Sequence, residues 1–276
     1  MIRQIIVTSF LVIITTYLHG QTISGMVLNK DSQIPIEFVN IGVLENPNGT
    51  VSSENGEYKL NLNETDQTIR FSSIGFESQT FLKEDLAKVE KVYLQPITYD
   101  IGMVNINSKR FEKQKKIGKR IRSRINTSAW GGSKFSGLEI GVPIKIKKES
   151  LLKSAHFGIL KSSTSNTRLR VNIYEFKNGK IGKNLMTENL LVKVQDIIKY
   201  GKIDLSHLNL VVTGDVLLSL ETVEQKEAEN FYLIFGTGVF FKGNIFTRDA
   251  SQATFRKEEI NDRSRIGAFL KVKQVK

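Results

Sequence analysis

The sequence predicts an all-β protein made of two β-sandwiches that are joined by a short basic helix or linker. Three observations support this prediction: short apolar runs alternate with polar turns, one strongly basic segment interrupts them, and the charge differs on its two sides. Residues 21–100 hold 6 Lys or Arg and 12 Asp or Glu, whereas residues 101–276 hold 33 and 16. This asymmetry indicates two units with different surfaces.

The N-terminus has the layout of a secretory signal peptide. An apolar run from Ile5 to Leu18 follows the basic residue Arg3, and it is shorter than the about 20 residues of a bilayer-spanning helix. We expect residues 1–20 to be removed on export, with an uncleaved anchor as the alternative. No later run is comparably apolar, so we expect no transmembrane segment in the mature chain. The expected location is the periplasm, the outer membrane or the cell surface.

Residues 21–107 predict the first sandwich. About seven short strand-like runs follow one another, as in the alternation of Tyr58, Leu60 and Leu62. The turns "NPNGT" and "ENGEY" contain Asn-Gly pairs, which accept positive φ and therefore close hairpins or tight loops.

Five motifs of this segment carry a resemblance. In order they are "ISGMV", "PIEFVNIGV", "GTVSSENGEYKLNL", "IRFSSIGFES" and "VYLQP". They resemble the pattern of the carboxypeptidase-like regulatory domain, a small transthyretin-like β-sandwich found in exported proteins of the Bacteroidetes group, in front of outer-membrane receptors or behind zinc carboxypeptidase domains. The resemblance implies structural roles, as turn glycines or core aromatics, for Gly25, Pro35, Gly49, Gly56, Tyr58, Phe71, Gly75 and Phe76. The His-x-x-Glu motif of zinc carboxypeptidases is absent from the sequence.

Residues 108–130 are predicted to be a basic linker that is partly helical. On a helical projection, Phe111, Ile117, Ile121 and Ile125 form a narrow apolar stripe, although Gly118 weakens a helix by about 1 kcal/mol. The segment is either a solvated linker or a surface for anionic lipid or glycan. Nucleic acid is not expected as a partner of an exported chain. The candidate anionic-ligand surface comprises Lys109, Arg110, Lys113, Lys115, Lys116, Lys119, Arg120, Arg122 and Arg124.

Residues 131–276 predict a second, jelly-roll-like sandwich of eight or nine strands. In one of them Arg168, Arg170 and Asn172 alternate with apolar residues, so we expect their face to lie in water. The stretch "RVNIYEFKNGKIGKNL" looks similar to the jelly-roll modules of exported Bacteroidetes proteins, which supports the fold only. A candidate aromatic platform for a sugar or a peptide comprises Trp130, Tyr174, Phe240 and Phe241.

Residues for catalysis are not evident. His156 and His207 are flanked by apolar residues rather than by carboxylates at metal-ligand spacing, so we expect a partnered structural role for each. Ser150 and Lys153 formally fit Ser-x-x-Lys, but the partner motifs of such acyl enzymes are missing. Glu224 belongs to "ETVEQKEAEN", which indicates a solvated connection. We therefore expect no catalytic residue, no cofactor and no metal, and leave a structural calcium ion in the second sandwich as an open alternative.

These observations favour an exported, non-catalytic binding, adhesion or assembly protein of the bacterial cell envelope. Its expected partner is an anionic glycan or lipopolysaccharide, or an outer-membrane protein. One alternative is a hydrolase of glycans or peptides that uses carboxylates of the second sandwich. Another is a scaffold that pairs with a membrane protein.

Overall fold

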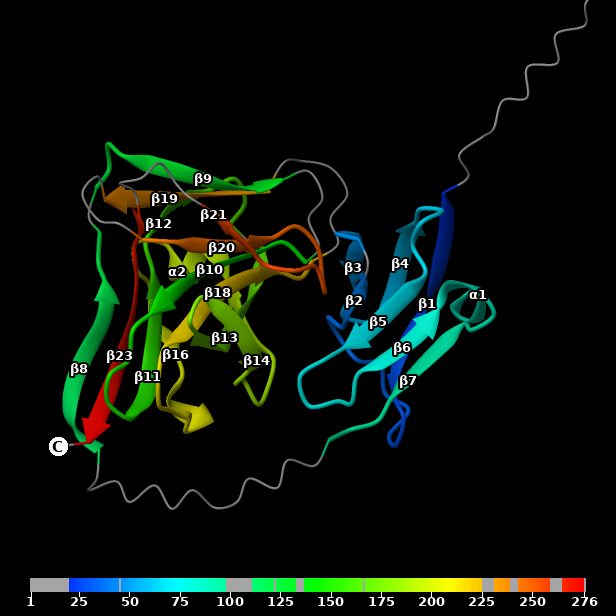
Figure 1. Cartoon of the computed structure of the whole chain (residues 1–276), viewed down its shortest axis with the longest axis horizontal. Helices are drawn as coiled ribbons and strands as arrows, with labels where there is room; N and C mark the ends of the chain where they lie inside the picture. Colours follow the sequence, from blue (N-terminus) through cyan, green and yellow to red (C-terminus); the bar gives the residue numbers. More distant parts are fainter. Residues whose placement is uncertain are drawn as a thin grey trace, which may run out of the picture.

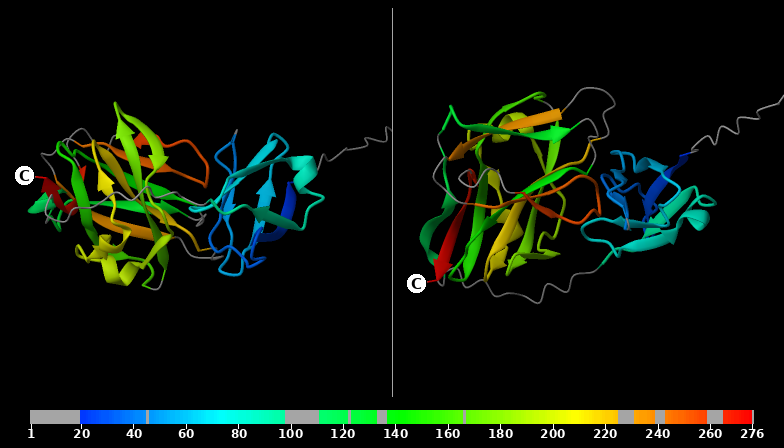
Figure 2. Two further views of the ribbon diagram at one scale, coloured as in Figure 1. Left: turned by 90° about the horizontal axis from the view of Figure 1, so that it is seen from below. Right: turned by 45° about the horizontal axis from the view of Figure 1, so that its top comes forward.

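The chain forms two lobes that lie side by side in every view (Figure 1 and Figure 2). The computed structural model describes residues 20–44, 46–97, 111–121, 123–132, 137–165, 167–224, 231–238, 243–258 and 265–275. The expected signal peptide therefore lies outside the described residues, except for Gly20. Strands dominate both lobes, so the all-β prediction is confirmed.

The first lobe, hereafter the first domain, packs two antiparallel-rich sheets face to face. One sheet has the order β4-β1-β7 and the other β3-β2-β5-β6, and only the pair β1 and β7 is parallel. The described strands are β1 (Gln21–Asn29), β2 (Asn40–Val43), β3 (Gly49–Val51), β4 (Glu57–Leu62), β5 (Thr68–Ser72), β6 (Gln79–Leu82) and β7 (Lys91–Leu94). A single helical turn, α1 (Lys83–Leu86), follows β6.

Strict alternation builds the core of the first domain. In β4 the side chains of Tyr58, Leu60 and Leu62 are buried while the residues between them are exposed, as the sequence predicts. The ring of Tyr58 meets Phe71 of the facing sheet edge to face, with centroids 5.3 Å apart. Gly56 adopts φ +74°, and a Cβ there would lie 2.6 Å from the carbonyl oxygen of Val27, so the turn requires glycine.

The second lobe, hereafter the second domain, contains three sheets around one continuous core. The seven-stranded sheet has the order β14-β13-β18-β10-β20-β21, with β15 also paired to β13. The five-stranded sheet has the order β16-β11-β23-β8, with β17 paired to β11, and the four-stranded sheet has the order β12-β19-β22, with β9 paired to β19.

The bounds of these strands are β8 (Phe111–Lys119), β9 (Thr127–Gly132), β10 (Glu139–Ile144), β11 (Ser150–Phe157), β12 (Ile159–Ser162), β13 (Arg168–Lys177), β14 (Lys180–Asn184), β15 (Leu190–Lys193), β16 (Ile203–Asp204), β17 (Val211–Val212), β18 (Val216–Thr222), β19 (Phe231–Gly238), β20 (Ile245–Arg248), β21 (Arg256–Glu258), β22 (Arg265–Ile266) and β23 (Ala268–Val275). Two short helical turns, α2 (Val194–Ile197) and a 3-10 turn (Ser206–Leu208), connect strands. Among the described residues, no helix is both long and apolar enough to cross a membrane.

The prediction of a helix within the basic segment is wrong. Residues 111–119 form the edge strand β8, which pairs along its whole length with β23. This backbone ladder outweighs the weak helical periodicity, and the expected apolar stripe does not form because Ile125 is 93% exposed. Gly118 has φ +110°, and a Cβ there would lie 2.5 Å from the carbonyl oxygen of Ala268. The segment therefore belongs to the sheets of the second domain, and its lysines lie on a sheet edge, where charge opposes edge-to-edge association.

The domains meet where a loop of the second domain presses against the sheet of the first. Ser251, which follows β20, is fully buried. Its backbone approaches Gly42 of β2 so closely that a Cβ on this glycine would overlap the carbonyl oxygen of Ser251. A small apolar cluster of Phe38, Val51 and Val223 closes the contact from both domains. The first domain is thus held by backbone fit as well as by apolar burial.

Gly42→Ala should separate the domains, because the added methyl group would overlap the backbone of Ser251. Unlike a side chain, this backbone cannot relieve the overlap by changing rotamer. We expect a loss of about 1 to 3 kcal/mol in the free energy of unfolding and a larger radius of gyration in small-angle X-ray scattering. Thr80→Ala, at an exposed position of the same sheet, is the control. An unchanged radius of gyration in Gly42→Ala would contradict the close approach.

Candidate functional site

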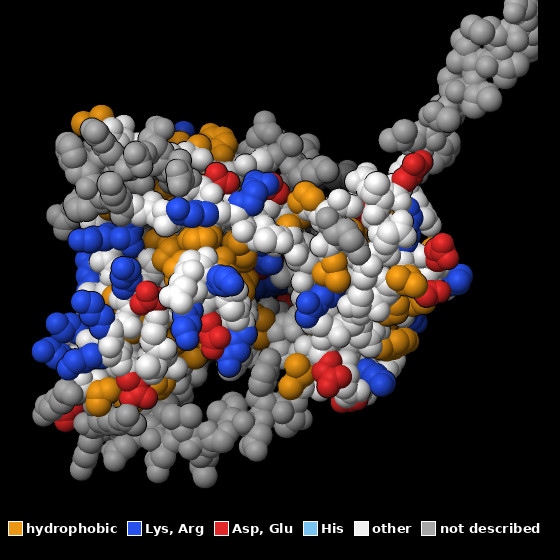
Figure 3. All heavy atoms as spheres, in the orientation of Figure 1, with side chains coloured by type: hydrophobic (Ala, Val, Ile, Leu, Met, Phe, Trp, Pro, Cys, Tyr) orange, Lys and Arg blue, Asp and Glu red, His pale blue; other side chains and the backbone are white. Residues whose placement is uncertain are grey.

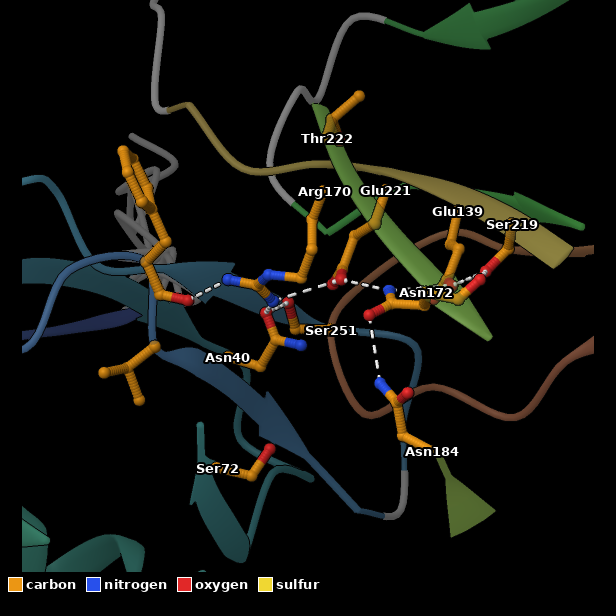
Figure 4. Close-up of polar contacts among 12 residues, drawn as sticks. Asn40, Ser72, Glu139, Arg170, Asn172, Asn184, Ser219, Glu221, Thr222 and Ser251 are labelled. Carbon is orange, nitrogen blue, oxygen red and sulfur yellow. Dashed lines mark hydrogen bonds and ion pairs between the residues drawn. The ribbon is translucent and has the colours of Figure 1, made fainter. Parts of the chain in front are cut away.

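Two arginines of β13 reach from the second domain into the first. The guanidinium group of Arg170 donates to the carbonyl oxygen of Phe38 and, over 2.9 Å, to Asn40 Oδ1 (Figure 4). That of Arg168 pairs with Glu54 and lies over the ring of Phe38, 4.9 Å from its centroid. Phe38 itself has φ +52°, an unusual conformation for a bulky residue. The two arginines therefore hold a strained turn of the first domain by its backbone, its ring and its acidic neighbour.

Behind this contact lies a buried network of two carboxylates and two guanidinium groups. Glu139 of β10 and Glu221 of β18 are both fully buried. Arg248 Nη2 lies 2.6 Å from Glu139 Oε2 and 3.2 Å from Glu221 Oε1, and Arg170 Nη1 lies 3.1 Å from Glu221 Oε2. Asn172 Nδ2 donates to both acids over 3.0 Å. The two positive and two negative charges balance, as buried charges require.

The two carboxylates differ in acidity. Burial raises the pKa of Glu139; Arg248 opposes this only in part, and the neighbouring charge of Glu221 adds to it. Burial would also raise the pKa of Glu221, but Arg170 and Arg248 together outweigh burial and hold this pKa below its usual range. Burial likewise raises the pKa of Tyr174, whose hydroxyl group donates to Glu139 over 3.3 Å.

A polar cleft of about 500 Å³ opens between the domains on the accessible side of this network, and we call it the interdomain cleft. The first domain contributes Asn40, Arg70, Ser72, Ser73, Ile74 and Ser78. The second contributes, among others, Arg170, Asn172, Tyr174, Lys183, Asn184 and Arg248. The two acids do not line it. In the space-filling view the surface is hollowed between the two lobes (Figure 3).

A second hollow, of about 440 Å³, lies on the outer face of the five-stranded sheet, and we call it the lysine groove. It is lined by six lysines, Lys115, Lys116, Lys153, Lys202, Lys271 and Lys273, together with Gln114, Ser154, Ser206 and Val272. The register of β8 and β23 sets Lys116 directly beside Lys271. Lys and Arg side chains gather over this end of the second domain (Figure 3). Among the described residues around the groove, Asp204 pairs with Lys202 at 2.6 Å.

His156 lies on the same face of the five-stranded sheet, where burial and the positive charge of the lysines both lower its pKa. Its Nε2 lies 2.9 Å from Ser154 Oγ, and its Nδ1 lies 3.0 Å from the carbonyl oxygen of Tyr200. Because a carbonyl only accepts, Nδ1 carries the proton and Nε2 accepts from the serine. Burial lowers the pKa of His156, and Lys271 and Lys116 lower it further. The partnered, structural histidine predicted from the sequence is therefore present, and it is neutral at pH 7.

The structure brings together only part of the predicted basic surface. Lys115 and Lys116 line the lysine groove. Lys113 and Lys119 are exposed on the same edge strand without lining it, Arg120 lies over the ring of Tyr200, 5.2 Å from its centroid, and Arg124 is exposed in the connection to β9. Lys109, Arg110 and Arg122 lie outside the described residues.

The two described residues of the predicted aromatic platform do not lie together. Trp130 of β9 is half-buried and meets Phe231 edge to face, with centroids 6.1 Å apart. Tyr174 belongs to a different sheet, where its ring meets Phe255 at 5.7 Å and lines the interdomain cleft. Phe240 and Phe241 lie outside the described residues. Of the two members that the structure describes, Tyr174 lines the interdomain cleft and Trp130 does not.

Sequence reasoning missed the buried network because it assigned the polar face of β13 to water. That expectation is wrong, because Arg170 and Asn172 are only 2% and 1% exposed. Arg170 contacts Phe38 and Asn40 of the first domain, and the Asn172 side chain bonds within the second. The expectation that Glu224 lies in a solvated connection is also wrong. Its side chain is mostly buried and pairs with Arg168 at 3.0 Å. The available signal was β18, "VLLSLET", in which Ser219 and Glu221 stand inside an apolar run. A polar residue within such a run indicates a buried partner.

Comparison with known families identifies the first domain. Residues 23–95 match the family model of the CarboxypepD_reg-like domain, a match that spans β1 to β7. The resemblance read from the sequence motifs is therefore confirmed for this domain. Domains of this family are regulatory and not catalytic. No curated protein and no solved structure matches the chain.

Glu221→Gln should destabilise the protein strongly, because it removes one of the two charges that balance the buried guanidinium groups. We expect the free energy of unfolding in urea to fall by about 3 to 5 kcal/mol. Glu175→Gln is the matched control: this carboxylate forms an exposed pair with Lys183, so its loss should cost at most about 1 kcal/mol. Equal, small losses in both variants would contradict a buried, balanced network.

Proposed function

We propose that the protein is an exported binding protein of the bacterial cell envelope, and that it captures an anionic glycan through the lysine groove. The supporting observation is the convergence of six lysines from β8, β11, β23 and the segment at β16 on one concave sheet face. A concave surface of one charge sign concentrates oppositely charged ligands. The signal-peptide pattern and the family of the first domain support export and a non-catalytic role.

The chemistry of the groove suits a polymer that carries spaced negative charges. Ammonium groups are compact point charges on flexible stems, so they follow carboxylate, sulfate or phosphate groups without demanding one geometry. The hydroxyl oxygen of the half-buried Ser206 can accept a hydrogen bond from a sugar hydroxyl, since its own proton is donated to the carbonyl oxygen of Lys153. Lipopolysaccharide, which bears phosphate groups, is a ligand of the same chemistry. A protein of the outer membrane as partner remains a proposal of the sequence alone.

A hydrolase is the second candidate, and the opposed pKa shifts of Glu139 and Glu221 favour it, since acid and base pairs are tuned in this way. The burial of the two acids favours the binding role instead. Their oxygens already accept from Arg170, Asn172, Arg248 and Ser219, which leaves a substrate no access to either. Turnover of an envelope glycan that is lost in Glu139→Gln, with unchanged stability, would support the hydrolase.

Lys116→Gln and Lys271→Gln should weaken binding of an acidic polysaccharide by about tenfold each, because each removes a positive charge from the lining of the groove. Wild-type affinity should fall as salt rises, since ions screen exposed charges beyond about 10 Å at 0.1 M. Lys180→Gln, an exposed charge on the β13–β14 hairpin, is the control. Binding that is absent, or that neither salt nor these lysines affect, would eliminate the electrostatic version.

The titration with the acidic polysaccharide, followed by NMR of the His156 ring, should show where the ligand binds. A bound anion offsets the field of Lys116 and Lys271, so the pKa of His156 should rise on binding from its lowered value. In the free protein the pKa of His156 lies below its ordinary value of 6.5. Neutral His156 therefore stabilises the fold fully above pH 6.5, and this stability is lost as the pH falls through the folded pKa. Binding without any change at His156 would place the ligand elsewhere.

A further inference from the structure

The interdomain cleft contains buried donors without partners. Of the six buried side-chain atoms that lack a hydrogen-bond partner in the described part of the chain, three belong to residues that line this one cleft: Ser73 Oγ, Arg170 Nε and Arg248 Nε. The side chains of Arg170 and Arg248 are 3% and 10% exposed. Buried polar groups are almost always hydrogen-bonded, and an unpaired donor is costly. Their concentration in one hollow indicates that an acceptor binds there.

The charge of the cleft selects the kind of acceptor. The buried acids already balance Arg170 and Arg248. Two further cations of the lining remain. Among the described residues, Lys183 pairs only with the exposed Glu175, at 3.5 Å, and the exposed Arg70 forms no ion pair. Arg70 comes from the first domain and Lys183 from the second, so a ligand that meets both carries negative charge and bridges the domains.

The remaining lining suits a polyhydroxylated ring. Hydroxyl and amide groups of Ser72, Ser78, Asn184 and Gln252 surround the cleft, and they both donate and accept. Ile74, Met186 and the ring of Tyr174 supply a limited apolar surface. The volume of about 500 Å³ falls within the range of about 300 to 1,000 Å³ that is typical of small-molecule sites. Donors, cations and a little apolar surface together fit a carboxylate-bearing sugar.

We propose that the interdomain cleft is a binding site for a single acidic sugar unit, whose carboxylate pairs with Arg70 and Lys183 and whose ring oxygens accept from Ser73, Arg170 and Arg248. This site is separate from the lysine groove, and the proposal does not rest on the function proposed for that groove. Because the lining comes from both domains, the ligand also stabilises their contact.

The test is calorimetric titration of the two-domain chain with D-glucuronate, with D-glucose and inorganic phosphate as comparison probes. Glucuronate should bind, and glucose should bind at least tenfold more weakly because it lacks the carboxylate, a difference of about 1.4 kcal/mol. Phosphate should also bind more weakly, because it lacks the ring. No saturable binding of glucuronate, or equal affinity for glucose or phosphate, would overturn the proposal.

Two variants at the edge of the buried network locate the site without removing its arginines. Lys183→Gln and Ser73→Ala should each weaken glucuronate binding about fivefold or more while thermal unfolding stays unchanged. Lys180→Gln, on the same hairpin as Lys183 but outside the cleft, should bind like wild type. Lys116→Gln should also bind glucuronate normally, which separates this site from the lysine groove. Wild-type affinity in both cleft variants, or equal loss in Lys180→Gln, would overturn the assignment.

Discussion

The structure depends on one buried cation, the guanidinium group of Arg170. A charge that is almost completely removed from water requires an opposite charge and hydrogen-bond acceptors close to it. Glu221 supplies the charge from within the second domain, and the carbonyl oxygen of Phe38 and the side chain of Asn40 supply acceptors from the first. Neither domain alone supplies these partners, and the Nε atom of Arg170 still lacks one. The relative position of the domains follows from this requirement. The apolar contact around Phe38 and the close approach of the Ser251 backbone to Gly42 are consistent with the same arrangement.

This arrangement gives the two hollows different chemistry. The interdomain cleft lies against a balanced network of fixed geometry, so its donors are preorganised and can select a small ligand by shape. The lysine groove lies on the outer face of another sheet, where long, solvated side chains select by charge. If both hollows bind as proposed, the protein would hold a charged polymer loosely along one face and one of its sugar units firmly between the domains. The family of the first domain, which is regulatory and not catalytic, is compatible with such a role as a docking partner of the second domain.

The fold of the first domain could be predicted because its sequence is locally consistent. Alternation in β4, glycine at the positive φ of residue 56 and the family motifs all indicate the same sandwich. The basic segment could not be predicted, because residues 111–119 are a strand only through pairing with β23, residues 268–275, near the other end of the chain. Local periodicity there favoured a helix, and long-range hydrogen bonds decided otherwise.

The candidate site was less predictable than the fold. The lysines of β8 were visible in the sequence, but the register that places Lys116 beside Lys271 was not. The polar face of β13 could not be recognised as buried, because nothing in its own sequence reveals that another domain covers it. A serine and a glutamate inside the apolar run of β18 were the one local sign of a buried network. Whether the polar face of a strand is buried between domains depends on the sequences of both domains. The residue pattern of one strand therefore cannot show it.

The most direct test of the account is whether the two domains share one fixed orientation in solution. Residual dipolar couplings of backbone amides, measured in a weakly aligned sample, report the orientation of each domain independently. If Arg170 locks the domains as described, one alignment tensor will fit the couplings of β1 to β7 and of β8 to β23 together. Two tensors of different magnitude would show that the domains move independently, and the central role assigned to Arg170 would be wrong.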